Sequence, residues 1–149
     1  MCPLYFYKQI IYNKSKRRLT QGVIMIKYQE SEEMYLETIL LLKQKSANVH
    51  AVNVAEELGY SKPSVSRGMG LLTQKGYITI GSGGEILFTE EGKKKAEGIY
   101  ERHTVITKLL EITGADREIA EENACRIEHV ITPELFEILK KFVKSVSEN

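Results

Sequence analysis

Apolar residues recur at helical spacing along most of the chain from Ser31 onward, which predicts a mainly α-helical protein. Positions three and four apart share one face of a helix, so each of these runs can bury one side. Two short β-prone runs flank the glycine-rich segment 81–84, which predicts a hairpin. The predicted helices cover residues 31–45, 52–58, 61–74, 90–113, 116–130 and 134–146, and the predicted strands cover residues 77–80 and 85–88.

Capping residues mark where several of these helices begin and end. Ser31 precedes two glutamates, which predicts a helix start because a short hydroxyl and acids both suit the positive end of a helix. Ser61 is predicted to cap the third helix, with Pro63 in the first turn, where a missing amide hydrogen costs little. Gly59 predicts the end of the second helix, and Thr89 is predicted to cap the fourth.

The first part of the chain therefore contains helix, helix, turn, helix and hairpin, an order typical of a winged helix-turn-helix. Three further helices follow, too few for a separate large domain and well suited to dimerisation. The predicted fold class is mainly α with a small β-hairpin: a winged helix-turn-helix followed by a helical domain.

The third helix is the candidate for reading DNA. Val65, Met69 and Leu72 are predicted to face the core, which leaves the polar N-terminal half exposed. Hydroxyls and cations there suit phosphates and base edges, while a wing contacts the flanking backbone or minor groove. For this helix alone a capped, solvated surface helix is the alternative, and the hairpin that follows favours DNA binding. The candidate DNA-binding residues are Ser61, Lys62, Pro63, Ser64, Ser66 and Arg67 in the helix, and Ser82 and Gly83 in the wing.

Charge divides the chain into two unlike parts. The 149 residues hold 21 Lys+Arg against 20 Asp+Glu, a formal net charge of +1. Residues 1–24 hold five of the basic residues and none of the acids, so residues 25–149 hold 16 bases against 20 acids. The first 24 residues are predicted to be a basic extension. It is either an arm that touches DNA phosphates or a segment that is not native, if translation starts at Met25.

Composition excludes several classes of protein. Hydrophobic residues make up 42% and charged residues 28%, which is typical of a globular domain and excludes a disordered chain. The apolar run 39–42 is far short of the roughly 20 residues of a membrane helix. Two cysteines are too few for a disulfide framework. We therefore expect a cytoplasmic protein with no membrane partner.

A second candidate site lies on the predicted helix 116–130. Four residues at i, i+4, i+7 and i+8 share one face and offer carboxylate, thiol and imidazole groups. This mixed donor set suits a divalent transition metal such as Fe(II), Mn(II), Co(II), Ni(II) or Zn(II). A solvated acidic face is the alternative, and the cysteine argues against it because cysteine usually avoids solvent. The candidates are Glu121, Cys125, Glu128 and His129, with His103 on the preceding helix.

Three stretches carry a resemblance to a known family: residues 33–39 (Glu-Met-Tyr-Leu-Glu-Thr-Ile), 102–103 (Arg-His) and 124–130 (Ala-Cys-Arg-Ile-Glu-His-Val). Around a winged helix-turn-helix, they resemble the metal-dependent repressors of the diphtheria toxin repressor family, which includes a manganese transport regulator branch. The match runs from about residue 26 to the C-terminus and implies a two-domain form without an SH3-like domain. The expected domains are a basic extension at 1–24, a DNA-binding domain at 25–89 and a helical metal-binding and dimerisation domain at 90–149.

The resemblance also implies a role for each candidate ligand. His103 corresponds to a shared ligand of a neighbouring site, and Glu37 to a glutamate of the manganese branch. Glu121 stands where the iron-responsive branch has a histidine and Thr107 where it has a glutamate, so a second site is expected to be altered, weaker or merged with the first. The primary activating site corresponds to Met34, Cys125, Glu128 and His129. The full candidate metal set is Met34, Glu37, His103, Glu121, Cys125, Glu128 and His129.

The choice of metal follows from ligand softness. The thioether of Met34 and the thiol of Cys125 disfavour Mn2+ relative to Fe2+, because Mn2+ prefers oxygen ligands. We therefore predict Fe2+ first and Mn2+ next, with Co2+, Ni2+ or Zn2+ able to act in vitro. The predicted function is a metal-activated transcriptional repressor of metal-ion uptake genes, which binds a palindromic double-stranded DNA operator as a homodimer.

Other classes of function stay open as alternatives. One is a winged-helix regulator that responds to a small organic ligand or to cysteine oxidation, and another is an antitoxin-like or structural dimer that binds no DNA. A metalloenzyme is the remote alternative. The sequence carries no marked substrate pocket, phosphate loop or nucleophile motif, so we do not expect an enzyme.

Overall fold

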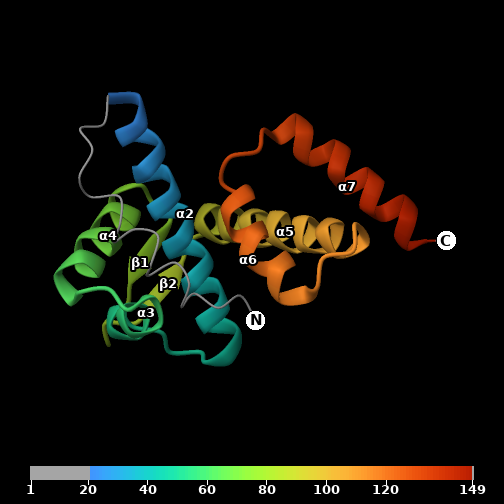
Figure 1. Ribbon diagram of the computed structural model, residues 1–149. Helices are drawn as coiled ribbons and strands as arrows, with labels where there is room; N and C mark the ends of the chain where they lie inside the picture. Colours follow the sequence, from blue (N-terminus) through green and yellow to red (C-terminus); the bar gives the residue numbers. More distant parts are fainter. Residues whose placement is uncertain (1–20, 149) are drawn as a thin grey trace. The chain divides into compact units, whose positions relative to one another are not determined.

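The computed structural model describes residues 21–148 of the chain, and side chains from Ser31 onward (Figure 1). Among these residues the only sheet is a two-stranded antiparallel hairpin, and the other elements are helices, so the predicted fold class is confirmed. The elements are α2 (Gln21–Lys45), α3 (Ala51–Leu58), α4 (Lys62–Gln74), β1 (Ile78–Ile80), β2 (Ile86–Phe88), α5 (Glu90–Ile112), α6 (Arg117–Ile127) and α7 (Pro133–Ser147).

The predicted start of the first helix at Ser31 is wrong. Helix α2 begins at Gln21, so it includes the last four residues of the expected basic extension and carries Ser31 in its interior. Residues 21–30 contain no proline, and a serine inside a helix costs only a few tenths of a kcal/mol relative to a good helix former. A local capping pattern was therefore overridden by a sequence that continues the helix upstream.

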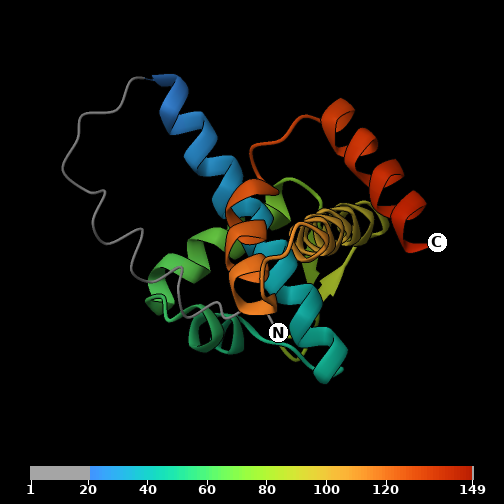
Figure 2. The same cartoon turned by 45° about the vertical axis from the view of Figure 1, so that its right-hand side comes forward.

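The helix-turn-helix forms as its capping residues predict. Gly59 adopts a left-handed φ of 63° at the end of α3, and its amide donates to the carbonyls of Ala55 and Glu56. Ser61 caps α4, where its side chain accepts a hydrogen bond from the Ser64 amide. Helix α2 packs against α3 and α4, which can be followed from teal to green in Figure 1 and Figure 2. The fully buried apolar side chains of these elements and the hairpin include Val54, Leu58, Val65, Leu72, Ile78 and Ile86.

The hairpin is tied to the loop before α3 at the residue pair next to its turn. Ile80 pairs with Ile86 across the strands, and the Ile86 amide also donates to the Val49 carbonyl at 2.7 Å, in the loop before α3. Gly84 has a φ of 82° in the turn, a conformation that glycine adopts at little cost. The turn end of the hairpin is therefore anchored to the loop that precedes α3.

Helix α5 begins in close contact with Gly76 and Tyr77, the two residues before β1. The Thr89 hydroxyl accepts a hydrogen bond from the Gly92 amide at 3.0 Å and donates to the Gly76 carbonyl at 2.6 Å, so the predicted cap is confirmed. A Cβ at Gly92 would lie 1.8 Å from the Tyr77 carbonyl oxygen. Only glycine permits this approach.

The described residues divide into two compact units between Glu97 and Gly98, inside α5. The second unit contains the rest of α5 and helices α6 and α7, drawn in orange and red in Figure 2. The last predicted helix, 134–146, was placed one residue late at its start, because Thr132 caps α7 and Pro133 is the first helical residue.

Helix α6 ends at Ile127, three residues before the predicted end at Val130. The amides of Val130 and Ile131 both donate to the Ile127 carbonyl, which turns the chain out of the helix. Pro133 follows closely and disfavours helical backbone in the residue before it, so the turn is consistent with the start of α7. No helix in the described part of the chain is long and apolar enough to cross a membrane.

Candidate metal centre and nucleic-acid interface

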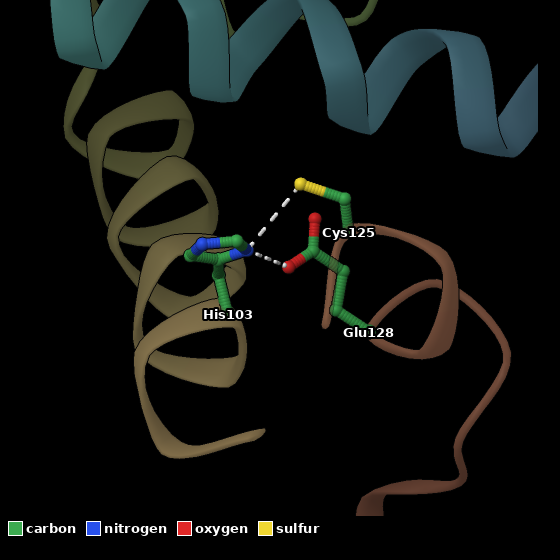
Figure 3. A group of neighbouring side chains, drawn as sticks. All are labelled: His103, Cys125 and Glu128. Carbon is green, nitrogen blue, oxygen red and sulfur yellow. Dashed lines mark hydrogen bonds and ion pairs between the residues drawn. The ribbon is translucent and has the colours of Figure 1, made fainter. Parts of the chain in front are cut away.

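His103, Cys125 and Glu128 meet in the second unit (Figure 3). Their potential ligand atoms all lie within 4.8 Å of one another. His103 Nδ1, on α5, is 2.9 Å from a carboxylate oxygen of Glu128 and 3.7 Å from Cys125 Sγ. One nitrogen, one sulfur and one oxygen therefore point into the same small volume.

Helix α6 and the turn after it present three of these candidates. Asp116 caps α6 by accepting a hydrogen bond from the Ile119 amide at 2.9 Å, and Cys125 lies in the last helical turn. Glu128 and His129 were predicted inside the helix but lie in the turn that follows it. Glu128 keeps helical dihedral angles and still donates its amide to the Ala124 carbonyl, so its side chain stays near that of Cys125.

The Glu128 carboxylate is 1% exposed and lies between two imidazoles. His129 Nε2 is 3.2 Å from one carboxylate oxygen, and His103 Nδ1 is 2.9 Å from the other. Burial raises the pKa of Glu128, but hydrogen bonds and charge from the two histidines outweigh it and leave the pKa below its usual value. The group is therefore a buried anion, which is unusual unless a cation is close.

The chemistry of this donor set fits a divalent transition metal. Imidazole and thiol ligands suit iron, cobalt, nickel and zinc, and a carboxylate adds negative charge that any divalent cation gains from. Thr107 Oγ1 lies 3.5 Å from His103 Nε2, so the second ring nitrogen faces a hydroxyl while the first faces the cluster. A contact of this kind orients a metal-ligating histidine.

Glu121 was predicted to share this face, and the structure gives its carboxylate a different neighbour. Arg117 Nε donates to Glu121 at 2.9 Å, and Arg117 Nη1 lies 3.8 Å from Glu111 at the end of α5. Glu121 is not among the three residues whose ligand atoms lie within 4.8 Å. Arg117 was not identified from the sequence as the partner of Glu121, although oppositely charged residues four apart on a helix commonly form an ion pair.

Met34 and Glu37 belong to the first unit. Both are buried, and Tyr60 donates a hydrogen bond to the Met34 sulfur at 3.6 Å. The cluster that the structure brings together consists of His103, Cys125, Glu128 and His129.

The candidate DNA-binding residues of α4 lie on its solvent side. All are exposed except Ser64, which is half-buried and accepts a hydrogen bond from Arg67 Nη2 at 3.3 Å. Ser82 and Gly83 are exposed at the tip of the hairpin. Val65, Met69 and Leu72 are buried, as their spacing predicts.

Tyr35 closes the other side of α4. A Cβ at Gly68 would lie 2.4 Å from the Tyr35 ring, so α2 and α4 approach at a glycine. A cavity of about 430 Å³ beside this contact is lined by Arg67, Leu71 and Lys75, among others. Nothing in the local sequence pattern predicts this cavity.

Two protein-family models match the chain, one on each part. The model of the iron-dependent repressor N-terminal DNA-binding domain matches residues 27–81. The model of the iron-dependent repressor metal-binding and dimerisation domain matches residues 89–149.

Individual relatives agree with these matches. The diphtheria toxin repressor of Corynebacterium diphtheriae is 31% identical over 121 residues, which are 80% of this chain and 54% of that protein. An uncharacterised helix-turn-helix transcriptional regulator of Methanocaldococcus jannaschii is also 31% identical over 121 residues, covering 80% of this chain and 97% of that protein. The chain thus spans about half the length of the first relative and nearly all of the second.

Solved structures share the fold. The structure of the manganese regulator SloR has a TM-score of 0.66 at 24% identity, over 76% of this chain and 53% of that chain. Identity at this level supports the common fold.

Proposed function

Because the chain belongs to the iron-dependent repressor family, we propose that it is a metal-activated transcriptional repressor of metal-ion uptake genes. The observation that carries the proposal is the buried cluster of His103, Cys125 and Glu128 in the region that matches the metal-binding model. The family is one of transcriptional repressors, so no enzymatic activity is proposed.

The proposed centre is built around His103 Nδ1, Cys125 Sγ, the Glu128 carboxylate and His129. A bound divalent ion would supply positive charge next to the buried Glu128 anion. The softness of the sulfur and imidazole donors supports Fe2+ over Mn2+. The resemblance in residues 33–39 supports Met34 and Glu37 as further ligands.

DNA binding is proposed for the winged helix-turn-helix at residues 25–89. Helix α4 exposes hydroxyls and Arg67 near its N-terminal end, and the hairpin exposes Ser82 and Gly83. A helix of this kind enters the major groove, and a twofold dimer places two such helices about 34 Å apart or a multiple of that distance. This geometry requires a palindromic operator.

Dimerisation is proposed for residues 90–149, through α7. One face of α7 packs inward at Phe136 and Val143. A second face leaves large apolar side chains exposed at helical spacing, which is typical of an interaction surface. These side chains are Leu135, Ile138, Phe142 and Val146.

Operator binding with and without metal tests the proposal. Duplexes selected from a random pool by the Fe2+-loaded protein would be measured in an anaerobic gel shift, with Fe2+, with Mn2+ and with a chelator. We expect tight binding with metal and loss of binding with chelator. Equal affinity in all three would sink the metal switch, and metal-free binding that depends on a reducing agent would favour the thiol-responsive alternative.

A further inference from the structure

Arg117 holds a carboxylate that lies one helical turn before Cys125. Its Nε is 2.9 Å from Glu121, and Glu121 is buried with a side chain only 9% exposed. The same guanidinium lies 3.8 Å from Glu111, so it lies between two acids, one on each of α5 and α6. Glu121 therefore has a fixed cationic partner in its own unit.

The position of Glu121 on α6 means that its pairing with Arg117 affects the metal centre. Residues four apart on a helix share a face, so Glu121 lies on the Cys125 side of α6. A carboxylate there would add a hard oxygen donor to the nitrogen, sulfur and oxygen donors of the centre. The three ligand atoms that lie within 4.8 Å do not include one from Glu121.

We propose that Arg117 determines which metal the centre prefers, because it holds Glu121 away from the ion. This inference rests on the proposed metal-binding function. With Glu121 paired and Cys125 reduced, the donors are dominated by imidazole and thiol, which suit cobalt, zinc and iron. With Glu121 released, an added carboxylate shifts the preference toward Mn2+, a cation that favours oxygen ligands.

The structure also supplies the means to separate this role from folding. The Arg117 side chain is 73% exposed but that of Glu121 is only 9% exposed, so urea unfolding of each variant without metal measures how much stability the pair contributes. Arg126 provides a matched control on the same helix, because its Nη2 pairs with Glu122 at 2.8 Å and Glu122 is more exposed than Glu121. Arg117→Gln and Arg126→Gln each remove one positive charge from α6.

The experiment measures the dissociation constants of Mn2+ and Co2+ for the full chain, by competition with a fluorescent chelator under anaerobic, reducing conditions. In Arg117→Gln we expect the ratio of the Mn2+ constant to the Co2+ constant to fall by about tenfold, the scale on which groups around a metal tune its binding. Arg117→Lys should keep the ratio of the unmodified protein, and Arg126→Gln should not change it. Adding Glu121→Gln to Arg117→Gln should restore the original ratio.

Glu121→Gln alone gives the sharpest opposing test. We expect less than a threefold change in either constant, because Arg117 already withholds that carboxylate. A loss of tenfold or more would make Glu121 a ligand and overturn the inference, as would an unchanged ratio in Arg117→Gln. If the unmodified protein binds neither ion, the proposed function itself fails, and that result is distinct from binding with an unchanged preference.

Discussion

Two buried glutamates, one in each unit, are neutralised in different ways. Glu32 is 8% exposed on α2 and forms ion pairs with Lys75 and with Lys95, the latter at 2.8 Å. Glu128 is 1% exposed and contacts the imidazoles of His103 and His129. Lysines carry a full charge at neutral pH, whereas an imidazole is close to its own titration range. Glu32 is therefore neutralised by two charged lysines, whereas the partners of Glu128 are imidazoles, which can themselves bind a metal ion.

The surroundings of Glu32 show how an ion pair with a purely structural role is built. Lys95 also donates to the Tyr77 hydroxyl at 3.2 Å and lies 4.5 Å from the centre of the Tyr77 ring. The cluster joins α2, the end of α4, the start of the hairpin and α5. Glu128, in contrast, lies beside a sulfur atom and two imidazoles. These groups can bind a metal ion, whereas the partners of Glu32 only hold helices and hairpin together.

The largest expected effect comes from removing the charge of Glu128. Glu128→Gln keeps the size of the side chain, and we expect metal affinity to fall by at least about 100-fold, because even residues behind the ligands are worth about 10–100-fold. At a metal concentration 100 times the dissociation constant, binding stabilises the folded protein by about 2.7 kcal/mol. Thermal melts with and without metal measure this gain, which should disappear in the variant.

Glu32→Gln is the control for that experiment. Its melting temperature should be lower than that of the unmodified protein, but metal should still raise it. A metal-induced shift that survives in Glu128→Gln, or that disappears in Glu32→Gln, would contradict the contrast between the two carboxylates.

The next effect is the loss of stability in Glu32→Gln itself. Removing one partner of a buried ion pair costs about 3–5 kcal/mol, and the partly exposed lysines reduce this to about 1–3 kcal/mol here. Urea unfolding at pH 7 measures the free energy. Lys93→Gln, which removes an exposed pair with Glu97, should change it by less than about 0.5 kcal/mol. Equal effects of the two substitutions would show that burial of Glu32 adds nothing.

The contribution of Glu32 depends on pH in a defined direction. Burial raises the pKa of Glu32, but Lys75 and Lys95 outweigh it and hold the pKa below its ordinary value of 4.5. A lowered carboxyl pKa stabilises the folded state above the unfolded value, and this gain is lost as the pH falls through the folded value. The difference between Glu32→Gln and the unmodified protein should therefore be constant near neutrality and shrink below about pH 4.5.

Features that depend on contacts between residues close in the sequence could be predicted. Gly59 and Ser61 cap helices through contacts within a few residues, so the helix-turn-helix was predictable. The spacing of Cys125 and Glu128 likewise placed two donors together. The predicted start of α2 was wrong because a capping pattern is equally compatible with the interior of a longer helix.

Contacts between distant residues could not be predicted. Glu32 lies 43 residues from Lys75 and 63 from Lys95, and no periodicity links such positions. The pairing of Arg117 with Glu121 was within reach of a helical spacing rule, but the choice between a cation and a metal as partner depends on side-chain direction, which spacing does not determine.

A smaller effect separates the roles of the two units. Arg67 is exposed and donates a hydrogen bond to the Ser64 hydroxyl, whereas Lys75, which caps the end of the same helix, forms an ion pair with Glu32. Arg67→Ala should weaken operator binding by about tenfold, within the 1–3 kcal/mol expected for a base contact, with metal affinity unchanged. Gel shift and metal titration measure the two properties. A parallel loss of both would mean that the substitution disturbs the fold.

The smallest expected effect concerns a third glutamate, Glu122, which is paired with Arg126 at 2.8 Å on the surface of α6. If burial and partner chemistry decide the role of a carboxylate, Arg126→Gln should change the free energy of unfolding by less than about 0.5 kcal/mol, the scale of exposed helical pairs. Metal affinity should change by less than twofold, although Arg126 is the residue after Cys125 in the chain. Urea unfolding and metal competition measure both quantities. A tenfold change in metal affinity would show that any charge on α6 tunes the centre, and the distinction between buried and exposed carboxylates would then fail for this helix.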